Sequence, residues 1–115
     1  MPELVRFSQI SPARQALVRL CQAANHGRID ELQIRDSEPV LSPAPSILFD
    51  LKLDSEEEPR PELGSDFVLS REVCRLLDRL DEIKNGRIER LEVRAGIPRR
   101  MVFESRLFRS QEVRR

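Results

Sequence analysis

The chain of 115 residues contains an internal repeat. Residues 27–35, with the sequence GRIDELQIR, are matched by residues 86–94, with the sequence GRIERLEVR. Each copy is followed after four residues by a proline, Pro39 in the first copy and Pro98 in the second. A repeat of this kind marks a repeated supersecondary unit, so the sequence predicts two copies of one unit that share a core. The repeat constrains the architecture far more than the function.

A helix is predicted before each repeated segment. Ser11 and Ser70 stand where N-caps are expected, because a serine hydroxyl accepts hydrogen bonds from the free amides of the first helical turn. Pro12 follows at a position where a missing N–H costs nothing. Gly27 is expected to end the first helix and Asn85-Gly86 the second, since these residue types tolerate a left-handed conformation. Apolar residues recur at helical spacing in two stripes, Ala13, Ala16, Leu17, Leu20, Cys21 and Ala24 in the first helix and Val73, Leu76, Leu77, Leu80 and Ile83 in the second.

Two strands are predicted after each helix. The side chains alternate in polarity along each repeated segment, which predicts one buried face per strand, with Leu32 and Ile34 in the first copy and Leu91 and Val93 in the second. Ile29 and Ile88 are one residue out of this alternation, so we assign them to a connecting turn or a bulge. The other expected elements are turns at 36–39 and 95–98, returning strands at 47–53 and about 100–107, and a proline-rich loop at 41–45.

These elements predict the α+β class. We expect a tandem duplication of an α-β-β unit that gives a four-stranded, mostly antiparallel sheet with two helices on one face. One helix and one hairpin cannot bury both of their apolar faces alone, so the two units are expected to pack as one domain. Residues 1–7 are expected to form a short edge strand. The predicted organisation is a first unit at 1–53, an acidic Pro-rich linker at 54–66, a second unit at 67–109 and a frayed tail at 110–115.

Residues 83–96, with the sequence IKNGRIERLEVRAG, resemble a family of very small uncharacterised bacterial proteins, the YezD-like family. In that family a short helix, a glycine and a strand-turn-strand hairpin make up nearly the whole chain. The segment from Gly86 to Gly96 is longer than in the family, and Ala95 replaces the acidic residue of the turn. The resemblance implies the fold and a bacterial origin, and it implies no activity. It also implies that a homodimer of one-unit chains is the ancestor of this two-unit chain.

The composition narrows the possible classes of function. The formal net charge is zero, so no overall field attracts nucleic acid or an anionic membrane. No apolar run is long enough to span a bilayer, and the first residues lack the basic and apolar regions of a secretory signal. Cys21 and Cys74 both fall inside predicted helices, and we interpret them as reduced, partly buried apolar residues. Reduced cysteines favour a cytoplasmic location.

No constellation of catalytic or ligand-binding residues is recognisable. His26 is the only histidine. It is interpreted either as a lone general base or, because Asn85 takes its place in the second copy, as a polar residue that caps the helix end. One histidine and two helical cysteines offer no metal-ligand spacing, and no nucleophile motif or phosphate-binding loop is present. The sequence therefore predicts no catalytic residue, no cofactor and no metal.

Charge is distributed unevenly along the chain. Residues 94–115 have a local balance near +5, and residues 50–66 have one near −5. The basic region is a candidate surface for contact with phosphate groups or with a partner. Alternatively, its arginines pair with the acidic linker or with cross-strand carboxylates such as Asp50, Glu92 and Glu104. The candidate residues for contact with an anion or a partner are Arg35, Arg94, Arg99, Arg100, Arg106 and Arg109.

Three functional hypotheses follow from these features. The leading one is a non-enzymatic interaction module that self-associates or binds an unknown protein through exposed sheet edges, since unpaired edges invite pairing. The alternative is binding of a polyanion or nucleic acid through the arginine-rich C-terminal strand and tail. The third is a small-molecule pocket or an enzyme between the helices and the sheet. No membrane partner is expected.

Overall fold

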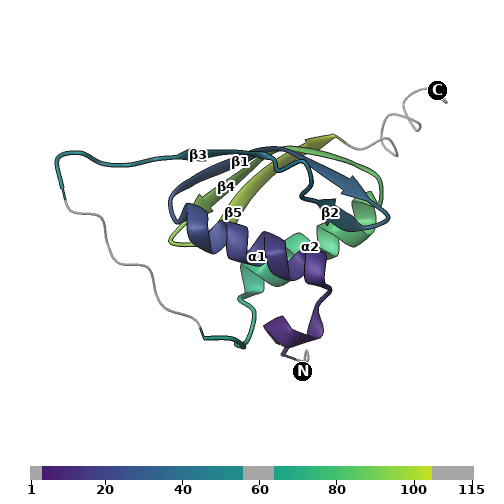
Figure 1. Cartoon of the computed structure of the whole chain (residues 1–115). Coiled ribbons are helices and arrows are strands. Elements are labelled where there is room, and N and C mark those ends of the chain that lie inside the picture. Colours follow the sequence, from purple (N-terminus) through teal and green to yellow (C-terminus); the bar gives the residue numbers. More distant parts are fainter. Residues whose placement is uncertain (1–3, 56–63, 105–115) are drawn as a thin grey trace.

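The computed structural model describes residues 4–55 and 64–104 of the chain. A sheet forms one layer, and both α-helices lie on the same face of it (Figure 1). The α+β class and the mostly antiparallel sheet are thereby confirmed. In chain order the elements are the 3₁₀ helix η1 (Phe7–Gln9), α1 (Pro12–Ala24), β1 (Gly27–Arg35), β2 (Glu38–Val40), β3 (Ser46–Phe49), α2 (Arg71–Ile83), β4 (Gly86–Arg94) and β5 (Ile97–Glu104).

The sheet has five strands rather than the four that the sequence predicts. Its order is β2-β1-β4-β5, and β3 also pairs with β1. The fifth strand arises because the returning segment of the first half divides into β2 and β3, which pair with opposite ends of β1. The loop between them contains Pro43 and Pro45. Proline lacks the amide that a strand ladder requires, so this stretch leaves the sheet.

The returning strands also differ from their predicted limits. β3 ends at Phe49, which lies opposite Gly27, the first residue of β1. No length of β1 remains beyond this point to pair with Leu51 and Leu53, and both side chains are exposed. β5 begins at Ile97, directly after the turn, and the residues beyond 104 that were expected to complete it lie outside the described part.

The centre of the sheet is the antiparallel pair of β1 and β4. Gly27 lies opposite Val93, and Gly86 lies opposite Ile34, so each strand begins beside the end of the other. We refer to residues 4–55 as the first half and to residues 64–104 as the second half. Corresponding positions in the two halves are those that coincide when Gly27 is aligned with Gly86.

Ile29 and Ile88 are fully buried under the helices, and both lie inside strands rather than in a connecting turn. In β1, Glu31 has a left-handed backbone with φ of 57°. Neither Glu31 nor Glu89 is paired in the register of β1 with β4, which is the same on both sides of this position. In β4, the register with β5 shifts between Ile88 and Arg90. Each irregularity returns the alternation to the core face, which explains why the two isoleucines are out of step in sequence.

The two helices begin as predicted and end earlier. The Ser11 hydroxyl accepts a hydrogen bond from the N–H of Arg14, and the Ser70 hydroxyl accepts one from the N–H of Val73, each at 3.2 Å. The predicted helix ends at Gly27 and at Asn85-Gly86 are wrong. The C-caps are Asn25, with φ of 58°, and Lys84, with φ of 60°. Both helices therefore stop without using glycine, and each glycine is the first residue of a strand.

The core lies between the helices and the sheet. The largest fully buried side chains come from the two α-helices and the two central strands, namely Leu17 and Cys21 of α1, Leu80 of α2, Ile29 and Leu32 of β1, and Ile88, Leu91 and Val93 of β4. Each large aliphatic side chain contributes about 1.5–3 kcal/mol when it is fully buried. Neither helix of the described residues is long and apolar enough to cross a membrane.

The segments that precede the two helices lie side by side. The N–H of Phe7 donates to the carbonyl of Phe67, and the N–H of Leu69 donates to the carbonyl of Val5, each at 2.8 Å. The rings of Phe7 and Phe67 are stacked with centroids 4.9 Å apart. In place of the edge strand expected over residues 1–7, the described residues form one isolated bridge and then η1, because Phe7 already belongs to that helix.

Asp66 links the segment before α2 to the segment before α1 through hydrogen bonds. Its carboxylate accepts hydrogen bonds from the Arg6 guanidinium and from the backbone N–H of Ser8, both at 2.9 Å. These donors, the Arg6 side chain first and the Ser8 amide second, lower the pKa of Asp66 to about 2. The acid is therefore ionised at any pH near neutrality.

Candidate functional site

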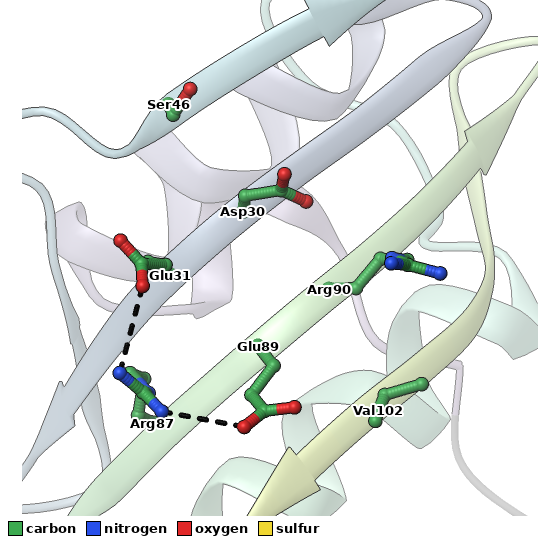
Figure 2. Close-up of a pocket in the computed structure, with 7 residues that line it drawn as sticks. All are labelled: Asp30, Glu31, Ser46, Arg87, Glu89, Arg90 and Val102. Atoms are coloured by element: carbon green, nitrogen blue, oxygen red, sulfur yellow. Dashed lines mark hydrogen bonds and ion pairs between the residues drawn. The ribbon is translucent and has the colours of Figure 1, made fainter.

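The sheet face that points away from the helices carries a shallow depression of about 450 Å³ (Figure 2). In it the Arg87 guanidinium lies between two carboxylates, 3.6 Å from Glu31 and 3.3 Å from Glu89. The lining residues are Asp30, Glu31, Ser46, Arg87, Glu89, Arg90 and Val102. Because the charges of both signs alternate and the site is open to water, each of these ion pairs contributes little to stability.

Asp30 is the most constrained polar group of this depression. One of its oxygens, Oδ2, accepts a hydrogen bond from Nε of Arg28 at 3.2 Å. The other, Oδ1, is buried and has no hydrogen-bond partner among the described residues. Arg90 lies opposite Asp30 in the strand register, but its side chain points away from that carboxylate (Figure 2). The described residues contain no cluster of three or more His, Cys, Asp or Glu side chains that could hold a metal ion.

The candidate arginines identified from the sequence do not form one basic surface in the described residues. Arg94 lies 3.4 Å from Asp50, Arg99 lies 3.0 Å from Glu72 of α2, and Arg100 lies 3.8 Å from Glu92. Arg35 is exposed at the end of β1, and Arg106 and Arg109 lie outside the described residues. Arg94, Arg99 and Arg100 thus lie beside carboxylates of residue 50, of α2 and of β4, which offset part of their charge.

His26 does not cap its own helix, contrary to the sequence prediction, because Asn25 takes that position. Its Nδ1 atom instead accepts a hydrogen bond of 3.3 Å from the N–H of Ala95, in the turn between β4 and β5. At the corresponding position, the side-chain oxygen Oδ1 of Asn85 accepts a hydrogen bond of 3.1 Å from the N–H of Asp36, in the turn between β1 and β2. Each polar side chain therefore holds the turn of the other half, which is a structural role.

The two cysteines are free thiols in the two helices. Cys21 is 1% exposed in the core, and burial raises the pKa of its thiol to about 12. Partial burial, and then the charge of Asp78, raise the pKa of Cys74 as well. A thiol with a raised pKa is a poor nucleophile, because the thiolate is the reactive form. Neither cysteine has the surroundings of a catalytic residue.

β5 is the longest strand at a margin of the sheet. It pairs with β4 on one side, and no strand of the described residues pairs with its other side. Arg100, Val102 and Glu104 lie opposite residues of β4 whose side chains are on the outer face, whereas Met101 and Phe103 lie opposite buried residues and pack against the core. The opposite margin of the sheet is broken into β2 and β3, which have three and four residues.

A second concave site, which the sequence prediction did not locate, lies where the start of α2 meets the end of α1 and the turn between β4 and β5. It encloses about 260 Å³ and is mostly apolar. Its lining residues are Val18, Gln22, Asn25, Phe67, Val68, Ser70, Val73, Ala95, Gly96 and Ile97. The sequence did carry one signal for it, because Val73 stands at the position that corresponds to Arg14. We call this site the α2 pocket.

The described residues form a two-layer α+β structure with a charged outer sheet face, a long strand β5 that pairs with them on one side alone, and a small apolar pocket. Comparison with protein-family models, with curated proteins and with solved structures found no match. The function must therefore be argued from the residues of this chain.

Proposed function

We propose that this protein is a non-enzymatic interaction module that self-associates through the free edge of β5. The observation that carries the proposal is that β5 has eight residues and pairs on one side alone within the described part of the chain. An unpaired edge presents a row of free N–H and C=O groups, which a second strand can satisfy. The divided margin formed by β2 and β3 offers no ladder of comparable length.

The residues of β5 are complementary to themselves in one antiparallel register. When Val102 of one copy lies opposite Val102 of a second copy, Arg100 lies opposite Glu104 on the same face. Two ion pairs then form across the two-fold axis, and Met101 lies opposite Phe103 on the other face. This symmetry is that of an isologous homodimer, the commonest oligomer of soluble proteins. The proposed occupant of the edge is therefore a second copy of the same chain.

Charge reversal in the full-length chain tests this register. In a homodimer, R100E would place two carboxylates opposite each other and E104R would place two guanidinium groups opposite each other, so each variant should be monomeric where the wild type is dimeric. A mixture of the two variants restores opposite charges across the axis, and we expect it to form heterodimers. Sedimentation velocity over a dilution series measures all three states. R99E is the matched control, because Arg99 contacts α2 and its reversal should leave the dimer unchanged.

Two results would overturn the proposal. A wild type that is monomeric at every concentration removes self-association altogether. A wild-type dimer that R100E and E104R leave intact removes β5 as its interface. Arg100 has 70% of its side chain exposed, so its reversal should leave the fold unchanged, and circular dichroism checks this.

The alternative is the binding of a polyanion or nucleic acid through the arginine-rich C-terminal strand and tail. One observation favours polyanion binding next to that strand, because Arg90 of the adjacent β4 is exposed and forms no ion pair with the described residues, as is also true of Arg35 in β1. The ion pairs of Arg94, Arg99 and Arg100 argue against it, since they offset part of the charge. A titration of duplex DNA at low salt tests it, because phosphate contacts are strongest there. Absence of binding under that condition would end this alternative.

The evolutionary part of the proposal is that the two halves arose by duplication of a unit like those of the YezD-like family. The register supports it, because Gly27 and Gly86 take equivalent places at the two ends of the central strand pair. We also propose a cytoplasmic location, on the ground that both cysteines are free thiols.

A further inference from the structure

The α2 pocket has the size and the chemistry of a site for a small apolar molecule. Its walls are formed chiefly by aliphatic side chains and one aromatic ring, with Val18, Val73 and Ile97 on three different elements. Ligand pockets are typically apolar, with a few polar groups that fix orientation. An apolar cavity of about 150 Å³ already accepts benzene, so a pocket of about 260 Å³ can hold a somewhat larger ring system.

One buried polar side chain lies at this pocket. Asn25 is 4% exposed and is the one buried polar residue of the described chain. Its backbone groups are satisfied, since its N–H donates to Cys21 and its carbonyl accepts from Gly96. Its side-chain amide lines the pocket, where a ligand group can form a hydrogen bond with it.

The corresponding cleft of the first half shows what a filled site looks like. There the Arg14 guanidinium donates to the carbonyl of Ser37 at 2.9 Å and lies 2.6 Å from Asp81 and 3.5 Å from Glu38. Only 16% of the Arg14 side chain is exposed. In the second half, Val73, Gln22 and Ile97 take the places of Arg14, Asp81 and Glu38, in that order. Valine is shorter than the arginine that fills the first cleft, and neither glutamine nor isoleucine carries the charge that pairs with that arginine.

The walls of the α2 pocket are held in place by contacts outside it. The Phe67 ring stacks on Phe7, and the Arg19 guanidinium lies over both rings, 5.3 Å and 4.5 Å from their centroids. On the other side, the N–H of Gly96 donates to the carbonyl of Asn25 at 2.9 Å. A pocket whose walls are fixed in this way remains open without a ligand, because collapse would break these contacts.

We propose that the α2 pocket binds a small, uncharged, largely apolar ligand of one or two rings that bears a single hydrogen-bonding group directed at the Asn25 amide. Charged ligands are disfavoured, because Val73 and Ile97 replace the ionic groups of the first cleft and leave no counter-charge in the pocket. The site shares only Ile97 with β5 and lies away from Arg100, Val102 and Glu104, so it adds a ligand-binding activity to the proposed self-association.

Indole is a suitable probe, because it has two rings and one N–H donor. In a titration of the full-length protein followed by NMR, we expect saturable shifts of the methyl signals of Val18, Val73 and Ile97. Half-saturation should fall in the millimolar range or below, as is usual for so small a ligand. Indene has nearly the same shape without the N–H, and it should bind about fivefold more weakly, because it forms no hydrogen bond with the Asn25 amide.

Two variants test the location. V73F fills the pocket with an apolar ring, and V73R/I97E introduces the guanidinium and carboxylate of the first cleft. Each should weaken indole binding at least about tenfold, which is the loss expected when a ligand is excluded from its site. L48F is the matched control, since Leu48 is exposed on the outer face of the sheet and does not line the pocket. It should bind indole like the wild type.

The proposal is overturned if indole shifts none of these methyl signals up to its solubility limit, or if V73F, with a folded spectrum, binds indole as tightly as the wild type. Equal affinity for indole and indene would remove the role of Asn25. Sedimentation of V73F separates this proposal from the first one, because the pocket variant should self-associate like the wild type whether or not indole binds.

Discussion

The cleft at the start of α1 and the α2 pocket at the start of α2 occupy corresponding places in the two halves. In both, a serine caps the helix and a turn of the sheet closes one side. The backbone hydrogen bonds also correspond, since the N–H of Ser37 in the first half donates to Lys84 of the second, and the N–H of Gly96 in the second half donates to Asn25 of the first. The contents differ, because one cleft holds an ion-pair network around Arg14 and the other is apolar and open.

The backbone shape of the two corresponding clefts and the side chains that occupy them are therefore specified by different residues. The caps and the turn amides set the shape in both halves. The side chains that occupy the clefts differ at three corresponding positions. The cleft at the start of α1 has Arg14, Glu38 and Asp81, and the α2 pocket has Val73, Ile97 and Gln22. Such positions can change without loss of the fold, and so they are where a new binding site can arise. Substitutions at matched positions of the two halves test this view.

The largest difference is expected at the two glycines that begin the central strands. Gly27 has φ of 155°, and a Cβ there would collide with the carbonyl of Leu48 in β3. G27A should lower the free energy of unfolding by about 3 kcal/mol, from backbone strain and the clash together. At Gly86 a Cβ would meet chiefly the flexible side chain of Ile83 at 3.1 Å, so G86A should cost less than about 1 kcal/mol. Urea denaturation of both variants measures the contrast, and equal losses would contradict it.

A smaller loss is expected when the first cleft is emptied. R14V gives this cleft the valine of the α2 pocket and leaves Glu38 and Asp81 without their shared cation. Both carboxylates remain partly hydrated, so the free energy of unfolding should fall by about 2 kcal/mol, the worth of a charged hydrogen bond. R14K is the control for charge, because lysine keeps the cation and loses the planar fork. Unchanged stability of R14V would mean that the network is dispensable.

The smallest difference is expected between the two helix caps. S70A removes one capping hydrogen bond and should lower the free energy of unfolding by about 1 kcal/mol. S11A removes the same bond and also the one that the Ser11 hydroxyl donates to the carboxylate of Glu38, so it should cost about 0.5 kcal/mol more. Paired denaturation curves are needed to resolve so small a gap. A larger loss in S70A would reverse the order and refute this account of the first cleft.

The parts of the fold that follow from local pattern could be predicted from the sequence. Ser11 and Ser70 mark the helix starts because capping is a contact within four residues. Ile29 and Ile88 reveal a local irregularity in each strand, because such an irregularity shifts the strand alternation by one residue. The helix ends at Asn25 and Lys84 were missed because positive φ values there are supported by contacts with the turns of the other half, which no local pattern records.

The candidate sites were less predictable for the same reason. The strand edge was expected in general terms, but the choice of β5 depends on the loop at 41–45 dividing the opposite margin. The α2 pocket could not be located from the sequence. The difference between Arg14 and Val73 is visible there, but only the structure shows that both residues lie at corresponding clefts. Of the predicted partners of the arginines, Glu92 lies beside Arg100, its neighbour in the register of β4 and β5. Asp50 lies beside Arg94 although it follows β3, which pairs with β1 and not with β4.

The exchange of backbone hydrogen bonds between the halves has a consequence for how the chain folds. The carbonyls of Asn25 and Lys84, at the ends of the helices, are satisfied by amides of Gly96 and Ser37 from the opposite half. Neither half can complete its own helix ends, and the central ladder of β1 and β4 also needs both. Unfolding should therefore be a single cooperative transition. Two fragments cut between residues 55 and 64 should be unstructured apart and regain the native fold on mixing.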